Sequence, residues 1–231
     1  MRRCLEQNMK RLAVLCFAAC WPVLTSGCAT PAPEAQEKKL DEKLAPYVLS
    51  RLPNTVQHRT FLDFGGKVQL LGYDISPSDV APPGSTISMT LYWQRTGALD
   101  EGWGLFTHIL DERGRQIAQR DSSGPLREVN ADGRQALGPS DWQIGKIYVD
   151  KLEFDVPRTE QKGGEQVPLQ TETITIAVGV WKDLARLDVL GGSSDAHRRG
   201  FVTHLKTGVK REASRKQTAE RASSAERTKD G

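Results

Sequence analysis

Apolar and polar residues alternate along several segments of this chain, most clearly in segments 86–95, 147–156 and 173–181. In the first of them, Ile87, Met89, Leu91 and Trp93 occupy every second position. A repeat of two places one set of side chains on each face of an extended strand. Each segment is therefore predicted to be a β-strand with one buried and one more polar face.

Shorter stretches of the same character complete the pattern. They lie at 68–75, 103–111, 116–121, 186–190 and 200–205 and are separated by Gly- and Pro-containing turns such as Pro82-Pro83-Gly84. About seven or eight short strands without an intervening helix are typical of an antiparallel β-sandwich. We predict an all-β, immunoglobulin- or jelly-roll-like sandwich over residues 61–205.

The N-terminal segment has a different pattern. Residues 1–11 are basic, and the uncharged stretch 12–24 is shorter than the ~20 residues that a membrane-spanning helix needs. This arrangement is typical of a secretory signal peptide. The sequence Thr25-Ser26-Gly27-Cys28 that follows resembles the lipobox of bacterial lipoproteins. The resemblance implies lipid attachment to Cys28 and cleavage before it; a plain signal peptide with a chance cysteine is the alternative.

Composition divides the rest of the chain. We expect residues 1–27 to be the signal peptide, 28–60 the lipidated cysteine and a Pro- and charge-rich tether, and 206–231 a basic disordered tail. All four cysteines precede residue 29, so the mature chain holds only Cys28 and forms no internal disulfide. The signal region carries the whole-chain charge of +3, which leaves the mature protein formally neutral and argues against a nucleic-acid partner.

A second resemblance covers roughly residues 64–190. The order of Leu71-Gly72-Tyr73-Asp74, Leu91-Tyr92-Trp93, Thr107-His108 and Val178-Gly179-Val180-Trp181 is similar to a β-sandwich module. That module occurs as the extracytoplasmic part of some multi-pass bacterial glycosyltransferases. The resemblance implies the sandwich fold and a setting in which envelope sugars are handled. No catalytic motif is among the matching residues.

Three carboxylates, Asp121, Asp141 and Asp150, lie at or beside the ends of predicted strands. Asp150 shares a strand face with apolar residues, and a half-buried carboxylate needs a partner. We expect Arg120, Arg127, a group of backbone amides or a structural calcium ion to provide it. No other metal or cofactor is expected.

The tryptophans suggest a sugar-binding surface. Trp142, between Asp141 and Gln143 in a predicted loop, is the leading candidate for an exposed stacking platform, and Trp103 and Trp181 follow at strand ends. A tryptophan in a sandwich loop more often closes the open end of the core, and the sequence favours this plug over the platform for Trp142. Ligand-binding candidates are therefore Trp142, Asp141, Asp121 and Trp181.

Catalytic signals are weak. The chain has no Gly-x-Ser-x-Gly, His-Glu-x-x-His or phosphate-loop motif. His108 shares a predicted strand face with Phe106, which favours a hydrogen-bonded core or interface histidine over a ligand or base. We predict no enzyme activity.

The sequence thus predicts a lipid-anchored protein on the extracytoplasmic side of the bacterial envelope, at the outer membrane where one exists. Its expected role is a non-catalytic binding or accessory module, with an envelope polysaccharide as the possible ligand. The alternative is a structural subunit of an envelope or secretion assembly that binds envelope proteins.

Overall fold

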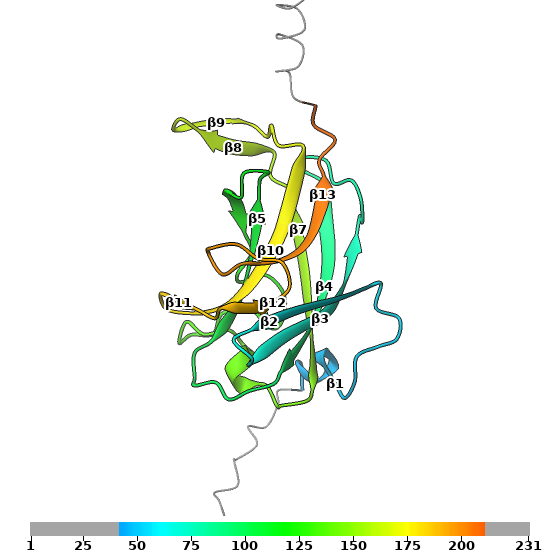
Figure 1. Cartoon of the computed structure of the whole chain (residues 1–231), viewed down its shortest axis with the longest axis vertical. Coiled ribbons are helices and arrows are strands. Elements are labelled where there is room, and N and C mark those ends of the chain that lie inside the picture. Colours follow the sequence, from blue (N-terminus) through cyan, green and yellow to red (C-terminus); the bar gives the residue numbers. More distant parts are fainter. Residues whose placement is uncertain (1–41, 211–231) are drawn as a thin grey trace, which may run out of the picture. The chain divides into compact units, whose positions relative to one another are not determined.

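The computed structural model describes residues 42–210, so the predicted signal peptide, Cys28 and the basic tail beyond residue 210 lie outside the described residues. The described part is all-β, with two short 3-10 turns, η1 (Ala45–Tyr47) and η2 (Pro139–Asp141), as its only helical elements (Figure 1). No helix in residues 42–210 has the length and apolar character to cross a membrane.

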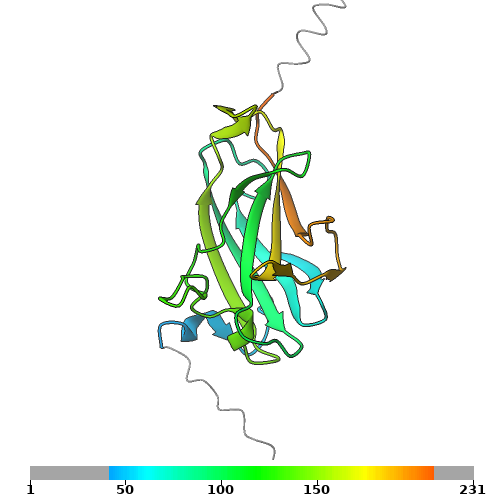
Figure 2. The ribbon, with the colours of Figure 1, turned by 90° about the vertical axis from the view of Figure 1, so that its left-hand side faces the viewer.

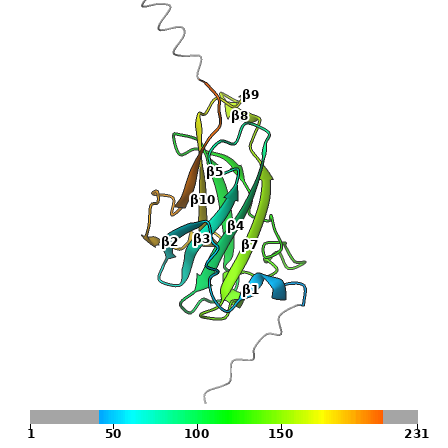
Figure 3. The ribbon, with the colours of Figure 1, turned by 90° about the vertical axis from the view of Figure 1, so that its right-hand side faces the viewer.

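Six strands form one sheet, in the order β1-β7-β4-β3-β2-β12. Their bounds are β1 (Val48–Leu49), β2 (His58–Phe64), β3 (Val68–Ser76), β4 (Thr86–Arg95), β7 (Ile147–Asp155) and β12 (Val189–Gly191). Every neighbouring pair is antiparallel. Figure 3 looks onto this sheet, with β2, β3, β4 and β7 in front.

A second, five-stranded sheet has the order β11-β10-β5-β6, with β13 also paired to β10. Its strands are β5 (Gly104–Leu110), β6 (Gln116–Gln119), β10 (Thr173–Lys182), β11 (Ala185–Arg186) and β13 (Gly200–Lys206). Figure 2 shows the molecule from the opposite side, with β5 in front of the other layer. A separate hairpin consists of β8 (Thr159–Lys162) and β9 (Glu165–Pro168).

The two sheets enclose one hydrophobic core. Inward-facing side chains such as Phe64 and Trp93 from the six-stranded sheet pack against Ile109, Ile176 and others from the five-stranded sheet. Trp93, Ile109 and Ile176 lie in segments that the alternating pattern predicted as strands, and the period of two identified their buried face. The predicted antiparallel β-sandwich is confirmed.

The domain begins earlier than predicted. Residues 45–60, assigned to the tether, form η1, β1 and the start of β2, and β1 pairs with β7. Val56 and neighbouring apolar residues cover Tyr92 and Val149 on the outer face of the six-stranded sheet. The tether prediction is therefore wrong for residues 45–60. Their apolar side chains are buried on strands β4 and β7, which come much later in the sequence.

Candidate binding pocket on the five-stranded sheet

The outer face of the five-stranded sheet carries a pocket of about 290 Å³, called the outer pocket below. Strands β5 and β6 and the β10–β11 hairpin form it. Its lining residues are Phe106, His108, Gln116, Gln119, Asp121, Trp181, Asp183, Leu184, Ala185 and Arg186. The volume lies near the lower end of the ~300–1,000 Å³ range of small-molecule sites, which suits one small ligand unit.

The floor of the outer pocket depends on a glycine. Phe106 on β5 lies across Gly179 on β10, where a Cβ atom would approach the ring to 2.2 Å. The Arg186 guanidinium lies on the same ring, with its carbon 4.6 Å from the centroid. Gly179, Phe106 and Arg186 thus form a stack, and the cation–π contact fixes the arginine over the ring.

His108 forms the rest of the floor. Its ring contacts Phe106 at 4.6 Å between centroids, and the residue is 4% exposed. The Nδ1 atom finds no hydrogen-bond partner among the described residues. Burial, and then the charges of Arg186 and Arg199, lower the pKa of His108 to about 4, so the ring is neutral at pH 7. His108 is thus buried, but beneath the outer pocket rather than in the core between the sheets, and the predicted hydrogen bonding is absent at Nδ1.

Asp121 lies at the wall beside His108. Its Oδ1 atom accepts a hydrogen bond from the Thr107 N–H at 3.1 Å and is 4.0 Å from His108 Nε2. Burial raises the pKa of Asp121, because removal of water disfavours the charged carboxylate. The side chain is nevertheless 29% exposed, so a ligand can reach it.

A tight hairpin forms the opposite wall. Trp181 pairs with Arg186 and Lys182 with Ala185, which leaves Asp183 and Leu184 as the two-residue turn. Asp183 has φ 54°, a left-handed conformation that Asp tolerates better than most residues. The indole of Trp181 is 39% exposed and supplies an apolar face at the pocket edge.

The structure thus brings together two of the predicted ligand-binding residues, Asp121 and Trp181, and separates them from the other two. Asp141 is exposed in η2 and lines a different, smaller crevice together with Trp103. The contribution of Gln116, Gln119, Asp183 and Arg186 was missed. A Gly- or Asn-containing turn would have revealed the hairpin, but Asp183-Leu184 carries no such signal.

The prediction of Trp142 as an exposed stacking platform is wrong. Trp142 is 1% exposed, stacks on Tyr148 with 4.5 Å between ring centroids, and donates its indole N–H to the Leu137 carbonyl at 2.9 Å. The ring face and the indole N–H of Trp142 thus both have their partners inside the molecule. The plug at the end of the core, which the sequence favoured over the platform, describes its position.

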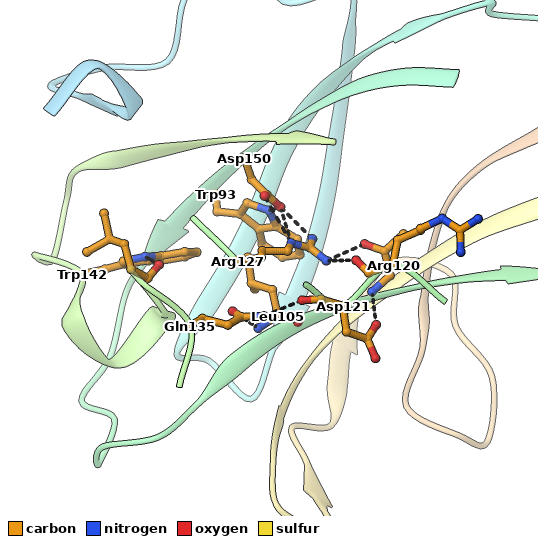
Figure 4. A network of polar contacts seen from close by, with 10 residues as sticks. Trp93, Leu105, Arg120, Asp121, Arg127, Gln135, Trp142 and Asp150 are labelled. Carbon is orange, nitrogen blue, oxygen red and sulfur yellow. Dashed lines mark hydrogen bonds and ion pairs between the residues drawn. The ribbon is translucent and has the colours of Figure 1, made fainter. Parts of the chain in front are cut away.

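Asp150 is fully buried, and its partner is Arg127, one of the two arginines proposed from the sequence. The Arg127 guanidinium donates to both carboxylate oxygens and to Thr107 Oγ1, and Trp93 Nε1 donates to Asp150 Oδ2 (Figure 4). Thr107 lies on β5 and Asp150 on β7, so the network joins the two sheets through the core.

The three carboxylates considered for calcium are not brought together. Asp150 pairs with Arg127, Asp121 lies in the outer pocket and Asp141 in η2. Residues 42–210 contain no group of three or more His, Cys, Asp or Glu side chains arranged to hold a metal ion.

Comparison with protein-family models and with curated proteins finds no match to this chain.

Proposed function

We propose that this protein is a lipid-anchored module of the bacterial cell envelope that binds a saccharide in the outer pocket without transforming it. The observation that carries this proposal is the combination of a half-exposed tryptophan, two amide side chains and a carboxylate around one small pocket. Aromatic faces pack against the C–H face of a sugar ring, and amides and carboxylates bind its hydroxyl groups.

The N-terminal sequence supports the proposed location. The basic segment, the short apolar stretch and the lipobox-like Thr25-Ser26-Gly27-Cys28 together suit export and lipid attachment. Two or more acyl chains on Cys28 give stable anchoring, because one chain alone binds a membrane only marginally.

The lining of the outer pocket supports a binding role. It contains no serine, threonine or cysteine that a neighbouring base could activate, and His108 and Asp121 are 4.0 Å apart, beyond hydrogen-bond distance. We expect oligosaccharides to be recovered intact after incubation with the protein. Release of new reducing ends that disappears in Asp121→Asn would instead identify a hydrolase.

The proposal is tested by binding to a panel of envelope oligosaccharides with Trp181→Ala. We expect the substitution to weaken binding by up to about tenfold, since an aromatic stacking contact contributes ~0.5–1.5 kcal/mol beyond the area that it buries. Phe61→Ala is the matched control, because Phe61 is an aromatic residue of the other sheet and is 52% exposed. Equal loss in both variants, or no binding by the unmodified protein, would contradict the proposal.

A structural subunit of an envelope assembly is the second candidate. Leu184 at the hairpin tip is fully exposed and lines the same pocket as the 39% exposed Trp181, so the hairpin offers more than one apolar side chain to a protein partner. Envelope proteins that co-purify at fixed stoichiometry and are lost in Leu184→Ser would support this candidate over saccharide binding.

A further inference from the structure

We propose that the outer pocket prefers a saccharide unit with a free amino group, so that a hexosamine binds more tightly than its N-acetylated or carboxylated counterpart. This inference rests on the proposed saccharide binding and adds the class of sugar. It follows from the charge of the lining and from which polar atoms of the lining already have partners.

The lining carries more negative than positive charge. Asp121 and Asp183 contribute two carboxylates, and Arg186 contributes the single cation. His108 adds no charge at neutral pH. These side chains leave a net negative charge, which repels a carboxylated sugar and attracts an ammonium group.

The single cation is already engaged. Arg186 lies over the Phe106 ring, and its Nη1 donates to the His197 carbonyl at 2.9 Å. Bidentate recognition of an anion requires that the two N–H groups of one guanidinium edge point at the ligand. The contacts of Arg186 hold it against the pocket floor instead.

Asp121 has capacity left for a cation. Its carboxylate oxygen Oδ1 accepts the hydrogen bond from the Thr107 N–H and is the oxygen that lies 4.0 Å from His108 Nε2. Neither contact involves Oδ2. The nearby buried cation Arg127 is paired with Asp150. A ligand ammonium at Oδ2 would form a charge-assisted hydrogen bond, which is roughly twice as strong as one between neutral groups. Burial raises the pKa of Asp121, and the charges of Arg127 and Arg186 offset this rise only in part.

The remaining groups favour a sugar over a simple amine. Gln116 Nε2 donates to Gln119 Oε1 at 3.0 Å. The side-chain oxygen of Gln116 and the side-chain N–H groups of Gln119 therefore remain for the hydroxyl groups of a sugar. Trp181 offers a ring face to the sugar or to its ammonium group. A lysine side chain of a protein partner would use Asp121 but neither amide.

The test is calorimetric titration of the full mature chain with four probes: a glucosamine tetramer, an N-acetylglucosamine tetramer, a galacturonic acid tetramer and a lysine-rich peptide. We expect the glucosamine tetramer to bind about tenfold more tightly than the N-acetylated one, and the galacturonic acid tetramer to bind most weakly. Asp121→Asn should remove the preference for the amine, so that the ratio of the two dissociation constants falls from about ten to about one. Asp132→Asn, the same change at an exposed aspartate outside the pocket, should have no effect.

Each other outcome has a separate meaning. Equal binding of the amine and N-acetylated tetramers, or tighter binding of the galacturonic acid tetramer, would overturn the amine preference while saccharide binding stands. Failure of all three oligosaccharides would overturn saccharide binding and the preference together. Tighter binding of the lysine-rich peptide than of the glucosamine tetramer, lost in Trp181→Ala, would replace the sugar by a protein partner.

Discussion

At the scale of single residues, the ion pair between Arg127 and Asp150 is the most constrained contact in the core. Both side chains are fully buried, and Arg127 donates to Asp150 and to Thr107 on the other sheet. Two buried charges are costly to desolvate, so such a pair adds less net stability than its geometry suggests. Removal of one partner is different, because the remaining charge is left in an apolar environment.

We therefore predict that Arg127→Leu destabilises the domain by about 3–5 kcal/mol in urea unfolding. The double variant Arg127→Leu with Asp150→Leu should recover part of that loss, since neither charge then remains. Arg134→Leu is the control: Arg134 forms exposed ion pairs with Asp132 and Glu101, and its removal should leave the midpoint unchanged. Additive losses in the double variant would contradict this account of the pair.

His108 gives the domain a predictable response to pH. The pKa of His108 is about 4 in the folded protein and about 6.5 when unfolded, so between these values the unfolded state binds more protons. Stability from this residue is present above pH 6.5 and is lost as the pH falls towards 4. The raised pKa of Asp121 acts with the opposite sign, since its stabilisation is lost as the pH rises.

We predict that His108→Gln, which stays neutral throughout, loses less stability than the unmodified protein on acidification. The difference should reach up to about 3 kcal/mol between pH 7 and pH 4. Urea unfolding at several pH values measures it. Parallel curves for the two proteins would show that His108 does not have a depressed pKa.

At the scale of elements, the alternating pattern predicted the strands whose two faces differ. β4, β7 and β10 each place one set of side chains in the core, and the predicted bounds match theirs closely. β1, β2 and the β8–β9 hairpin were not among the predicted strands. Their partners lie far along the chain or their side chains are mostly polar, so the local pattern has no buried face to report.

The sequence predicted only part of the candidate site, because a local pattern does not show which side chains the fold brings together. Asp121 and Trp181 stood out as a carboxylate and an aromatic residue at strand ends, and the fold brings them together. Trp142 had a similar local setting, but its burial depends on Tyr148 and on the Leu137 carbonyl. Such contacts are a property of tertiary structure, which residue type and spacing alone do not specify.

The segment before β2 yields a prediction of its own. Val56 is 8% exposed and belongs to the apolar cluster on the outer face of the six-stranded sheet. Val56→Asp would bury a carboxylate without a partner and should destabilise the domain by more than ~2 kcal/mol. Val80→Asp is the matched control at a site that is 44% exposed, and its effect should stay within about 0.5 kcal/mol. Equal effects would indicate that residues 45–57 do not pack on the sheet.

At the scale of the whole molecule, the two outer faces of the sandwich differ in what lies on them. Residues 45–57 cover part of the outer face of the six-stranded sheet, and the outer pocket lies on the outer face of the five-stranded sheet. Residues 45–57 therefore lie on the sheet that does not carry the pocket. On the proposed function, anchoring and ligand binding involve separate surfaces and can be removed independently.

We accordingly predict that Cys28→Ala, expressed with its own signal segment in a bacterial host, loses incorporated palmitate and appears in the soluble envelope fraction. Its folded domain should bind the same oligosaccharide as the anchored protein with unchanged affinity, because no residue of the outer pocket precedes residue 106. Cys20→Ala is the matched control, since Cys20 lies inside the apolar stretch before the lipobox-like sequence and its loss should leave lipid attachment intact. Membrane retention of Cys28→Ala would mean that the attachment lies elsewhere. Reduced affinity in a soluble Cys28→Ala protein would instead show that the anchor contributes to binding, by holding the pocket at a membrane surface where the ligand is concentrated.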